Sequence, residues 1–565
     1  MLTFAVFDKS GPAIAFPLRH AHCLINDGVT VSADIELERG SICVEKSVDG
    51  SAGLGLNFPT ESVEVSLGGT TSVRLGGGNI TLHTCMLPER ERPYLLSLEL
   101  ARHQIMLLLN KLEEWSLFEH AADDPVLRLV EKAREAFTEA LLATRYDPTI
   151  TNGYTNAAER AARRALDLGV AAGEAMAILQ ARLQHTRRVT GELARIAAHP
   201  PPANALTDSE ARQSKSMLAG SPGVILTDFP KVGCRVNPAF FAPELANSIA
   251  GACDFVCLPM RWVEMEPTEG KYSFTRTDRW IEWAIMKAKL PVHAGPVLDL
   301  HPSCVPDWLY IWEHDYETFR DVVCDYVKNL VTRYRKTVHT WCVASGLNVG
   351  GSFRLTYEQC MELTKLCCAL VKKLQPQARV SVELAMPFGE YTGMARGAKA
   401  IAPGLYAELI NQVQVECDIL GVRLQAGHAD PGRSARDLLT ISSLLDDLAS
   451  YDKPISISVM GCPSRAAQPN ETPADAALEP GHWRAPWSEQ TQSAWLASVA
   501  AMVAAKPYVT SICWQELLDA PATNGGEMPG GGLMATMAQP KPALRALSDL
   551  RAALREKKPA LPGLA

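Results

Sequence analysis

The side chains best suited to moving protons are three carboxylates that stand beside short runs rich in β-branched residues. Asp299 and Glu383 end two such runs, and Glu516 comes two residues after Trp514, which ends a third. Two carboxyl groups that face each other can act as acid and base when one is protonated and the other ionised. Asp299 and Glu516 are therefore a candidate acid–carboxylate pair. The alternative is that each carboxylate only accepts hydrogen bonds from Arg261, a loop amide or a neighbouring histidine.

The runs that carry these carboxylates belong to an alternating pattern between about residues 218 and 555. Short apolar runs are separated by longer amphipathic segments. Eight parallel strands, each followed by a helix, are what a (β/α)8 TIM barrel requires, and its functional side chains collect at the C-terminal strand ends. The sequence therefore predicts an α/β fold dominated by such a barrel. The predicted strands are 224–227, 255–258, 292–295, 340–343, 380–383, 419–422, 455–458 and 511–514.

The residues before the barrel show two other patterns. Residues 1–92 are short apolar runs broken by Gly, Asp, Asn and Pro, which predicts a β-rich, sandwich-like domain. Residues 93–198 have apolar side chains at helical spacing and predict a helical region. A proline-rich and polar stretch makes 199–217 a predicted linker to the barrel at 218–555. The helices fit either a bundle that clamps the sheet to the barrel or the interface of a homo-oligomer.

Composition and charge argue against several classes of partner. The 565 residues contain 55 basic and 63 acidic side chains, a net charge of −8, without a Lys/Arg-rich run, so nucleic acid is not an expected partner. No apolar stretch reaches the roughly 18 residues of a membrane-spanning helix. The N-terminus lacks the basic start of a signal peptide, and the 15 scattered cysteines are typical of a reducing compartment. A cytoplasmic protein is expected, although a leaderless export route stays open.

Several strings at the predicted strand ends occur in a recognisable order. The second strand is followed by Met260-Arg261-Trp262 and Glu266-Pro267, the fourth carries Trp341, and the eighth ends at Trp514 before Pro540-Lys541-Pro542-Ala543. In this succession, residues 220–550 resemble the family 10 glycoside hydrolases, the endo-β-1,4-xylanase barrels. The resemblance implies a (β/α)8 barrel that acts on a β-1,4-linked, xylan-like polysaccharide or oligosaccharide.

The same resemblance implies two catalytic glutamates, and this chain has other residues at the matching positions. Gly346 stands where the family has its acid/base, and Val459 stands where it has its nucleophile. Retaining hydrolysis needs two carboxyl groups roughly 5–5.5 Å apart, and neither glycine nor valine supplies one. The nearest downstream carboxylates, Glu358 and Glu471, lie too far along the chain to replace them. The family's two-glutamate chemistry is therefore predicted to be absent, and Asp299, Glu383 and Glu516 are the candidate replacements.

Much of the surround that would handle a sugar is retained. The resemblance assigns substrate binding to Arg261, which replaces a lysine, and to His301, Gln425, His428 and Trp514. Trp308 and Trp487 could add faces on which pyranose rings lie. Asp299, His301 and His428 could also be interpreted as metal ligands, but no tight His-x-x-x-His or Cys-x-x-Cys spacing supports that, so no metal or other cofactor is expected.

Three hypotheses from different functional classes follow. The chain is a hydrolase that works with relocated carboxylates, a non-catalytic protein that holds a carbohydrate ligand without cutting it, or an assembly scaffold with a vestigial cleft. The N-terminal β-rich domain fits a carbohydrate-binding module or a docking and oligomerisation unit, and it has no tryptophan before Trp115. The residue types at Gly346 and Val459 favour weak or absent hydrolysis with some retained affinity for glycans.

Overall fold

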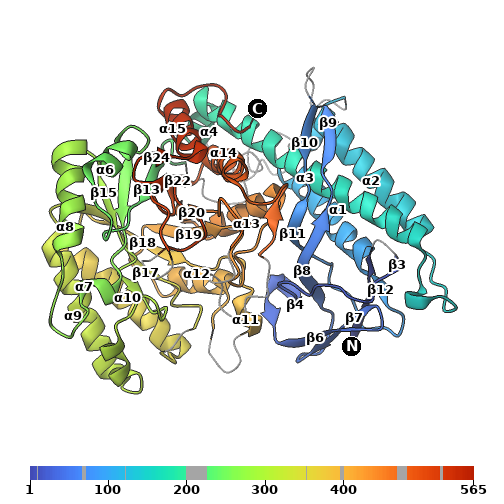
Figure 1. Cartoon of the computed structure of the whole chain (residues 1–565), viewed down its shortest axis with the longest axis horizontal. Coiled ribbons are helices and arrows are strands. Elements are labelled where there is room, and N and C mark those ends of the chain that lie inside the picture. The colour runs from blue at the N-terminus through green and yellow to red at the C-terminus, as the bar shows by residue number, and fades with distance from the viewer. Residues whose placement is uncertain are drawn as a thin grey trace.

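The computed structural model describes the chain apart from residues 9–10, 67–71, 121–122, 199–225, 351–352, 395–399, 468–479, 522–525 and 565. Residues 231–514 contain eight parallel strands that form a closed ring. The first strand closes the ring because it pairs with both the second and the eighth, so that Gly233 stands opposite Phe255 and Cys513. The predicted (β/α)8 TIM barrel is therefore confirmed (Figure 1). The predicted linker, 199–217, lies outside the described residues.

Seven of the predicted barrel strands overlap observed strands, and the first does not. Residues 226–230 form no strand, and the first strand lies at 231–235 instead. A Cβ on Gly233 would stand 2.4 Å from the Phe255 ring, so this strand needs a glycine, which weakens its sequence signal. The strands are β13 (Lys231–Arg235), β14 (Phe255–Leu258), β15 (Val292–Ala294), β16 (Leu298–Asp299, beside β17), β17 (Val338–Ser345), β18 (Arg379–Leu384), β19 (Ile419–Gln425), β20 (Ile455–Gly461) and β22 (Val509–Trp514).

Helices cover the outside of the barrel, and local sequence sets their ends. Before the helix that follows β17, Thr356 and Gln359 form a capping box in which each side chain accepts a hydrogen bond from the other's backbone N–H. The main helices are α6 (Pro243–Ala250), α8 (Thr275–Glu282), α9 (Tyr316–Tyr334), α10 (Tyr357–Leu374), α12 (Pro403–Gln412), α13 (Leu438–Ala449), α14 (Glu489–Ala505) and α15 (Pro542–Arg555).

The predicted β-rich region is present at the N-terminus. One sheet has the strand order β12-β1-β7-β6, and the other has the order β21-β11-β8-β4-β5. The edge strand β21 (His482–Trp483) comes from the barrel part of the chain, so the second sheet contains segments of both regions. The other strands are β1 (Leu2–Ala5), β4 (His22–Leu24), β5 (Thr30–Val31), β6 (Ala33–Glu38), β7 (Ser41–Lys46), β8 (Gly53–Thr60), β11 (Gly78–His83) and β12 (Tyr94–Leu95), beside a hairpin of β9 (Val63–Ser66) and β10 (Ser72–Leu75).

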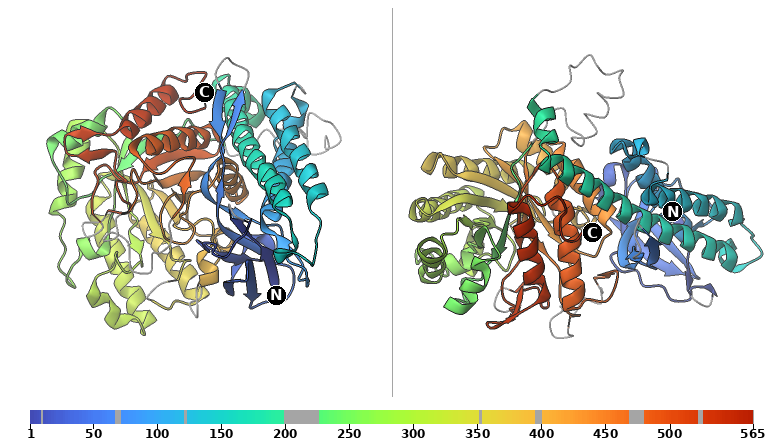
Figure 2. Two further views of the ribbon diagram at one scale, coloured as in Figure 1. Left: turned by 45° about the vertical axis from the view of Figure 1, so that its right-hand side comes forward. Right: turned by 90° about the horizontal axis from the view of Figure 1, so that it is seen from above.

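Three long helices join the β-rich region to the barrel. They are α1 (Leu96–Glu114), α2 (Pro125–Ala143) and α3 (Asn156–Val189), and the short α4 (Glu192–Ala198) follows. α1 and α2 pack on α3, which itself contacts α13 and α14 of the barrel and extends across both regions (Figure 2). Gly173 allows this close approach, since a Cβ there would lie 3.0 Å from the Leu439 side chain. No helix in the described ranges is long and apolar enough to cross a membrane.

Buried polar side chains fix the junction that these helices make. Glu174 of α3 accepts hydrogen bonds from Gly76 N at 2.9 Å and from Trp483 Nε1 at 2.8 Å, and it pairs with Arg484 at 2.6 Å. It therefore joins a helix, a turn of the β-rich region and the strand β21. This is the clamp that the sequence offered as one of two roles for the helices, while a homo-oligomer stays a prediction.

A second buried ion pair ties α1 to the barrel helices. The carboxylate of Asp446 in α13 accepts hydrogen bonds from Lys506 Nζ at 2.7 Å, Tyr508 Oη at 2.6 Å and Trp115 Nε1 at 3.1 Å. Burial alone would raise the pKa of Asp446, but the ammonium groups of Lys506 and Lys111 outweigh it and hold the pKa below its ordinary value. Asp446 is therefore ionised, and its charge is balanced inside the protein.

Asp446→Asn is expected to lower the free energy of unfolding by about 3–5 kcal/mol, because it leaves the Lys506 ammonium buried without a counter-charge. A carboxylate whose pKa is lowered by folding stabilises the folded protein at pH values above the pKa that it has in the unfolded chain. This stabilisation is lost as the pH falls below about 4. The free energy of unfolding of the variant should therefore fall less on acidification than that of the wild type. Urea denaturation at several pH values, followed by tryptophan fluorescence, measures both effects. The matched change Asp549→Asn removes an exposed partner of Arg545 and should change stability little; equal losses in both variants would contradict the assignment.

Candidate functional site

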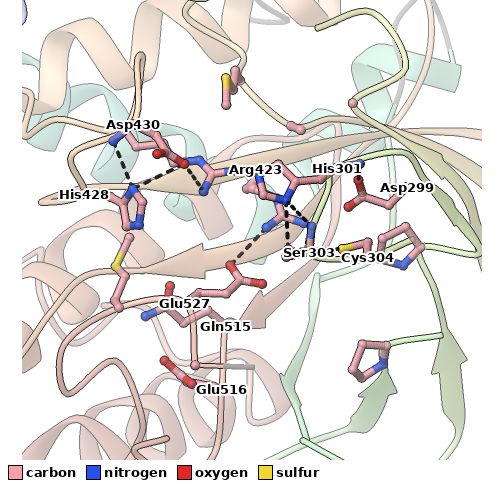
Figure 3. A pocket seen from close by; sticks show the side chains of 18 of the residues that line it. Asp299, His301, Ser303, Cys304, Arg423, His428, Asp430, Gln515, Glu516 and Glu527 are labelled. Carbon is pink, nitrogen blue, oxygen red and sulfur yellow. Dashed lines mark hydrogen bonds and ion pairs between the residues drawn. The ribbon is translucent and has the colours of Figure 1, made fainter. Parts of the chain in front are cut away.

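The C-terminal ends of the barrel strands surround a cavity of about 1190 Å³. This is the face on which functional side chains of a (β/α)8 barrel meet, and the volume is at the upper end for ligand sites. Charged and polar groups are brought together around it from strands and loops that lie far apart in sequence (Figure 3). The lining residues discussed below include Arg235, Arg261, Asp299, His301, Gly346, Arg423, His428, Glu516 and Glu527.

Glu383 lies beneath this cavity and does not line it, in contrast to the expectation from its place at a strand end. Its side chain is 1% exposed. It accepts hydrogen bonds from Ser345 Oγ at 2.7 Å, from Ser458 Oγ at 2.5 Å and from Arg423 Nε and Nη2 at 3.0 and 2.9 Å. Burial alone would raise the pKa of Glu383, but the Arg423 charge and the two hydroxyls lower it. Glu383 is an ionised acceptor whose donors are Arg423 and two serines, and not the Arg261, loop amide or histidine that the sequence suggested as alternatives to catalysis.

The two serines that hold Glu383 directly precede the positions where catalytic glutamates were sought. Gly346 lines the cavity with φ = +64°, and a Cβ there would lie 3.3 Å from the Cβ of Ala385. Val459 is 1% exposed and pairs with Arg423 in the barrel wall. Neither position places a polar side-chain atom in the cavity. The interior polar groups at these strand tips are directed at Glu383 instead.

Glu527 is a cavity residue that the sequence did not reveal. Its Oε1 accepts from Arg235 Nη1 at 2.7 Å, and its Oε2 accepts from Arg423 Nη1 at 3.0 Å and from Gln425 Nε2 at 2.8 Å. Burial would raise the pKa of Glu527, but Arg423 and Arg235 outweigh it and hold the pKa far below its ordinary value. Glu527 lies in a loop after the last barrel strand, beyond the strand ends at which functional side chains were expected. The nearest sequence signal is the pair of glycines that precedes it.

Glu516 also lines the cavity, and its environment is the opposite of that of Glu527. Its Oε1 is buried and has no hydrogen-bond partner among the described residues. Burial, together with the charges of Glu527 and Asp519, raises the pKa of Glu516 well above its ordinary value. Folding therefore favours the protonated form of Glu516 relative to an exposed carboxyl group. Two carboxyl groups with pKa values shifted in opposite directions are a pattern found in acid–base sites.

Asp299 lines the cavity, but it is not a near neighbour of Glu516. Figure 3 shows the two side chains on different sides of the view, with Arg423 and Glu527 between them. Asp299 accepts a hydrogen bond from the backbone N–H of His301 at 2.9 Å. The exposed His301 ring is in turn 2.8 Å from the Ser303 hydroxyl through its Nδ1. The structure thus brings Asp299 and Glu516 to one cavity without a hydrogen bond between these two residues.

Arg261 and His428 are cavity residues, as expected, and each has a fixed orientation. Arg261 pairs with Glu264 at 2.7 Å and donates to the carbonyl of Ser303. The Nδ1 of His428 accepts from the backbone N–H of Asp430 at 3.1 Å. Burial lowers the pKa of His428 despite the Asp430 charge. The ring is therefore neutral, and it also makes a hydrogen bond with the backbone of Glu527.

Three of the predicted binding residues do not line the cavity. Trp514 is fully buried, donates to the carbonyl of Gly531 at 2.9 Å and packs against Trp495. It is therefore not exposed to form the floor of a subsite. Trp308 is half-buried and donates to the carbonyl of Glu266, while Gln425 is buried and binds Glu527. Two tryptophans line the cavity: Trp262, which is 2% exposed, and Trp487, whose Nε1 donates to the carbonyl of Gly481 at 2.9 Å.

Comparison with known proteins gives one family match and several similar solved structures. Residues 228–348, from before β13 to just after β17, match the sequence model of glycosyl hydrolase family 10. Among solved structures, xylanase B from Clostridium stercorarium F9 is 15% identical with a TM-score of 0.42, covering 57% of this chain and 97% of that one. Xylanase 10B from Thermotoga maritima is 17% identical with a TM-score of 0.43, covering 58% and 96%. An endo-1,4-beta-xylanase from Caldicellulosiruptor owensensis is 18% identical with a TM-score of 0.42, covering 57% and 97%. The chain thus carries a closed (β/α)8 barrel whose first half matches the sequence model of glycosyl hydrolase family 10.

Proposed function

We propose that the barrel cavity binds a β-1,4-linked, xylan-like glycan and does not hydrolyse it by the two-glutamate retaining route. The observation that carries this proposal is the pair of strand tips at Gly346 and Val459, which present no carboxylate to the cavity. The family match over residues 228–348 supports a carbohydrate as the ligand class. The cavity on the C-terminal face supplies a place of sufficient size for it.

The cavity offers the groups that an uncharged, hydroxyl-rich ligand needs. Arg261 supplies a guanidinium whose position is fixed by Glu264, and the neutral His428 ring lines the cavity while bonded to the Glu527 backbone. The half-buried Trp487 gives an apolar face for the C–H groups of a sugar ring. The ionised Glu527 and the arginines that surround it are mutually neutralised. Binding is therefore expected to depend on hydrogen bonds and ring contact rather than on net charge.

Hydrolysis with relocated carboxylates is the second candidate, and Glu516 is the observation that favours it. A buried carboxyl group in the cavity whose pKa is raised by burial is shifted in the direction that a general acid requires. This alternative also needs a second carboxylate close to Glu516, and the described residues do not supply one that is free. Both oxygens of Glu527 are occupied by arginines, and Asp299 lies away from Glu516 across the cavity (Figure 3).

The scaffold hypothesis has less support from the structure. α3 is built into the junction with the barrel, because Arg188 donates to the carbonyls of Ala504 and Lys506 and Glu174 holds Trp483. The helices therefore stabilise one chain. Deletion of residues 94–198 would expose barrel surface in addition to removing any contact between chains.

Trp487→Ala is expected to weaken binding of xylohexaose about 5- to 10-fold, because an aromatic face contributes about 1–1.4 kcal/mol to such a contact. The matched change Trp308→Ala removes a tryptophan outside the cavity lining and should leave the affinity unchanged. Isothermal titration calorimetry with xylohexaose, and with cellohexaose and a maltohexaose control, measures both. Equal affinity of the wild-type protein for all three sugars, or no binding at all, would contradict the proposal.

The wild-type protein is expected to release no more reducing sugar from xylan than buffer does, under conditions in which xylohexaose binds. Product analysis by mass spectrometry after long incubation checks this. Release that Glu516→Gln abolishes, while binding is kept, would instead establish the relocated-acid alternative. Glu264→Gln, which alters a cavity carboxylate that already pairs with Arg261, is the matched control.

Glu516→Gln is also expected to stabilise the protein at neutral pH. A carboxyl group whose pKa is raised by folding remains protonated when the unfolded chain has ionised, so stability declines as pH rises from about 4.3 towards the folded pKa. The amide has no such penalty. The stability difference between variant and wild type should therefore be small at acidic pH and grow towards neutral pH in urea denaturation. A constant difference across this range would show that Glu516 is ionised in the folded protein.

A further inference from the structure

A second group of chemically active side chains lies outside the cavity, where the β-rich region meets the barrel. His22 of β4, His83 at the end of β11 and Glu390 in the loop after β18 have ligand atoms that all lie within 4.8 Å of one another. Across the described ranges, this is the one group of three His, Cys, Asp or Glu side chains that meets this distance. Imidazole nitrogens with a carboxylate oxygen are a donor set that zinc uses in proteins.

The two histidines have the separation and the orientation of metal ligands. The Nε2 atoms of His22 and His83 are 3.3 Å apart. Two nitrogens bound at 2.0–2.1 Å to one tetrahedral ion stand about 3.3–3.4 Å from each other. His22 Nδ1 is 2.7 Å from the carbonyl oxygen of His20 and must donate to it, which leaves the Nε2 of the neutral ring as an acceptor. A backbone carbonyl that orients the far ring nitrogen is the usual companion of a metal-binding histidine.

The sheet explains why these rings converge. Gly55 of β8 stands directly opposite His22 on one side and His83 on the other. Residues opposite each other on neighbouring strands share a face of the sheet. A Cβ on Gly55 would lie 2.3 Å from His22 Nε2 and 2.7 Å from His83 Cδ2. The glycine therefore opens the space in which the two imidazoles meet.

Glu390 and a third histidine, His20, lie next to the two imidazoles. Glu390 is 4% exposed; its Oε2 accepts from Gly432 N at 2.7 Å, and its Oε1 pairs with Arg436. Each carboxylate oxygen has two acceptor positions, so these contacts leave room for coordination. His20 is 6% exposed, and its Nε2 is buried without a hydrogen-bond partner among the described residues. It lies close enough to Glu390 and His22 to interact with them electrostatically.

We propose that His22, His83 and Glu390 bind one divalent transition-metal ion, with Zn²⁺ the ion that fits the geometry and a water as the fourth ligand. This site does not depend on the proposed function of the cavity. Its position gives it a structural consequence, because Gly432 belongs to a loop of which His428, Asp430 and Arg433 line the cavity. A bound ion would tie Glu390 to the two histidines of the N-terminal sheet. Through the hydrogen bond between Glu390 and Gly432 it would also restrain this loop.

The test uses the full-length protein, first freed of metal with a chelator and then titrated with Co²⁺ or Zn²⁺. The wild type is expected to bind one ion per chain and to show the intense visible absorption of four-coordinate Co²⁺. His22→Gln and His83→Gln should each weaken Zn²⁺ binding by more than about 100-fold. Removal of a residue that only orients a metal ligand typically costs about 10- to 100-fold, so a larger loss indicates direct coordination. His293→Gln is the matched control, because it changes a histidine stacked on Phe255 in the barrel wall and should keep the full affinity.

Two results would overturn the proposal. The first is a metal-free wild type that binds neither ion under these conditions, a measurement that does not depend on how the variants fold. The second is Zn²⁺ affinity that is equal in the wild type, His22→Gln and His83→Gln. Circular dichroism and thermal unfolding accompany each titration. Zn²⁺ is expected to raise the Tm of the wild type and of His293→Gln, and to leave the Tm of a folded His83→Gln unchanged.

Discussion

The guanidinium of Arg423 determines what the interior of this barrel can do. Its side chain is 7% exposed, and its charge lies between Glu383 below and Glu527 beside the cavity. A buried charge of this kind is tolerated when it is paired and hydrogen-bonded. The two carboxylates that meet this requirement are then ionised and occupied. Ser345 and Ser458 complete the shell of Glu383, so the strand tips beside Gly346 and Val459 are used to hold an ion pair.

The alternation of strands and helices made the barrel predictable, because strands buried on both faces need runs of apolar residues and helices need a single apolar stripe. The first strand escaped because Gly233 interrupts its run to accommodate the Phe255 ring. The contribution of β21 to the N-terminal sheet was also not predictable, since a two-residue strand has no periodicity. Its place depends on partners such as Glu174, more than 300 residues away in sequence.

The predicted strand ends identified some residues of the candidate site correctly. The sequence did not predict which loop residues reach the cavity or in which direction side chains point. Asp299 and Glu516 reach the cavity from strand ends. Glu527 lies on a loop, where sequence carries no register. Trp514 turns into the core, at a point where the pairing of β20 and β22 is irregular, and spacing does not reveal that direction. The cluster of His22 and His83 is hidden for a similar reason, because its members are 61 residues apart and are brought together by strand pairing.

A cavity that binds a glycan without a free carboxylate nucleophile should form no covalent sugar adduct. The most direct measurement is the intact mass of the protein after incubation with an activated 2-fluoro-xylobioside, which traps the glycosyl ester of a retaining enzyme. The account predicts an unchanged mass under conditions in which xylohexaose competes for reversible binding of the same compound. A mass increase of one glycosyl unit, located by peptide mapping on any carboxylate of the barrel, would contradict it.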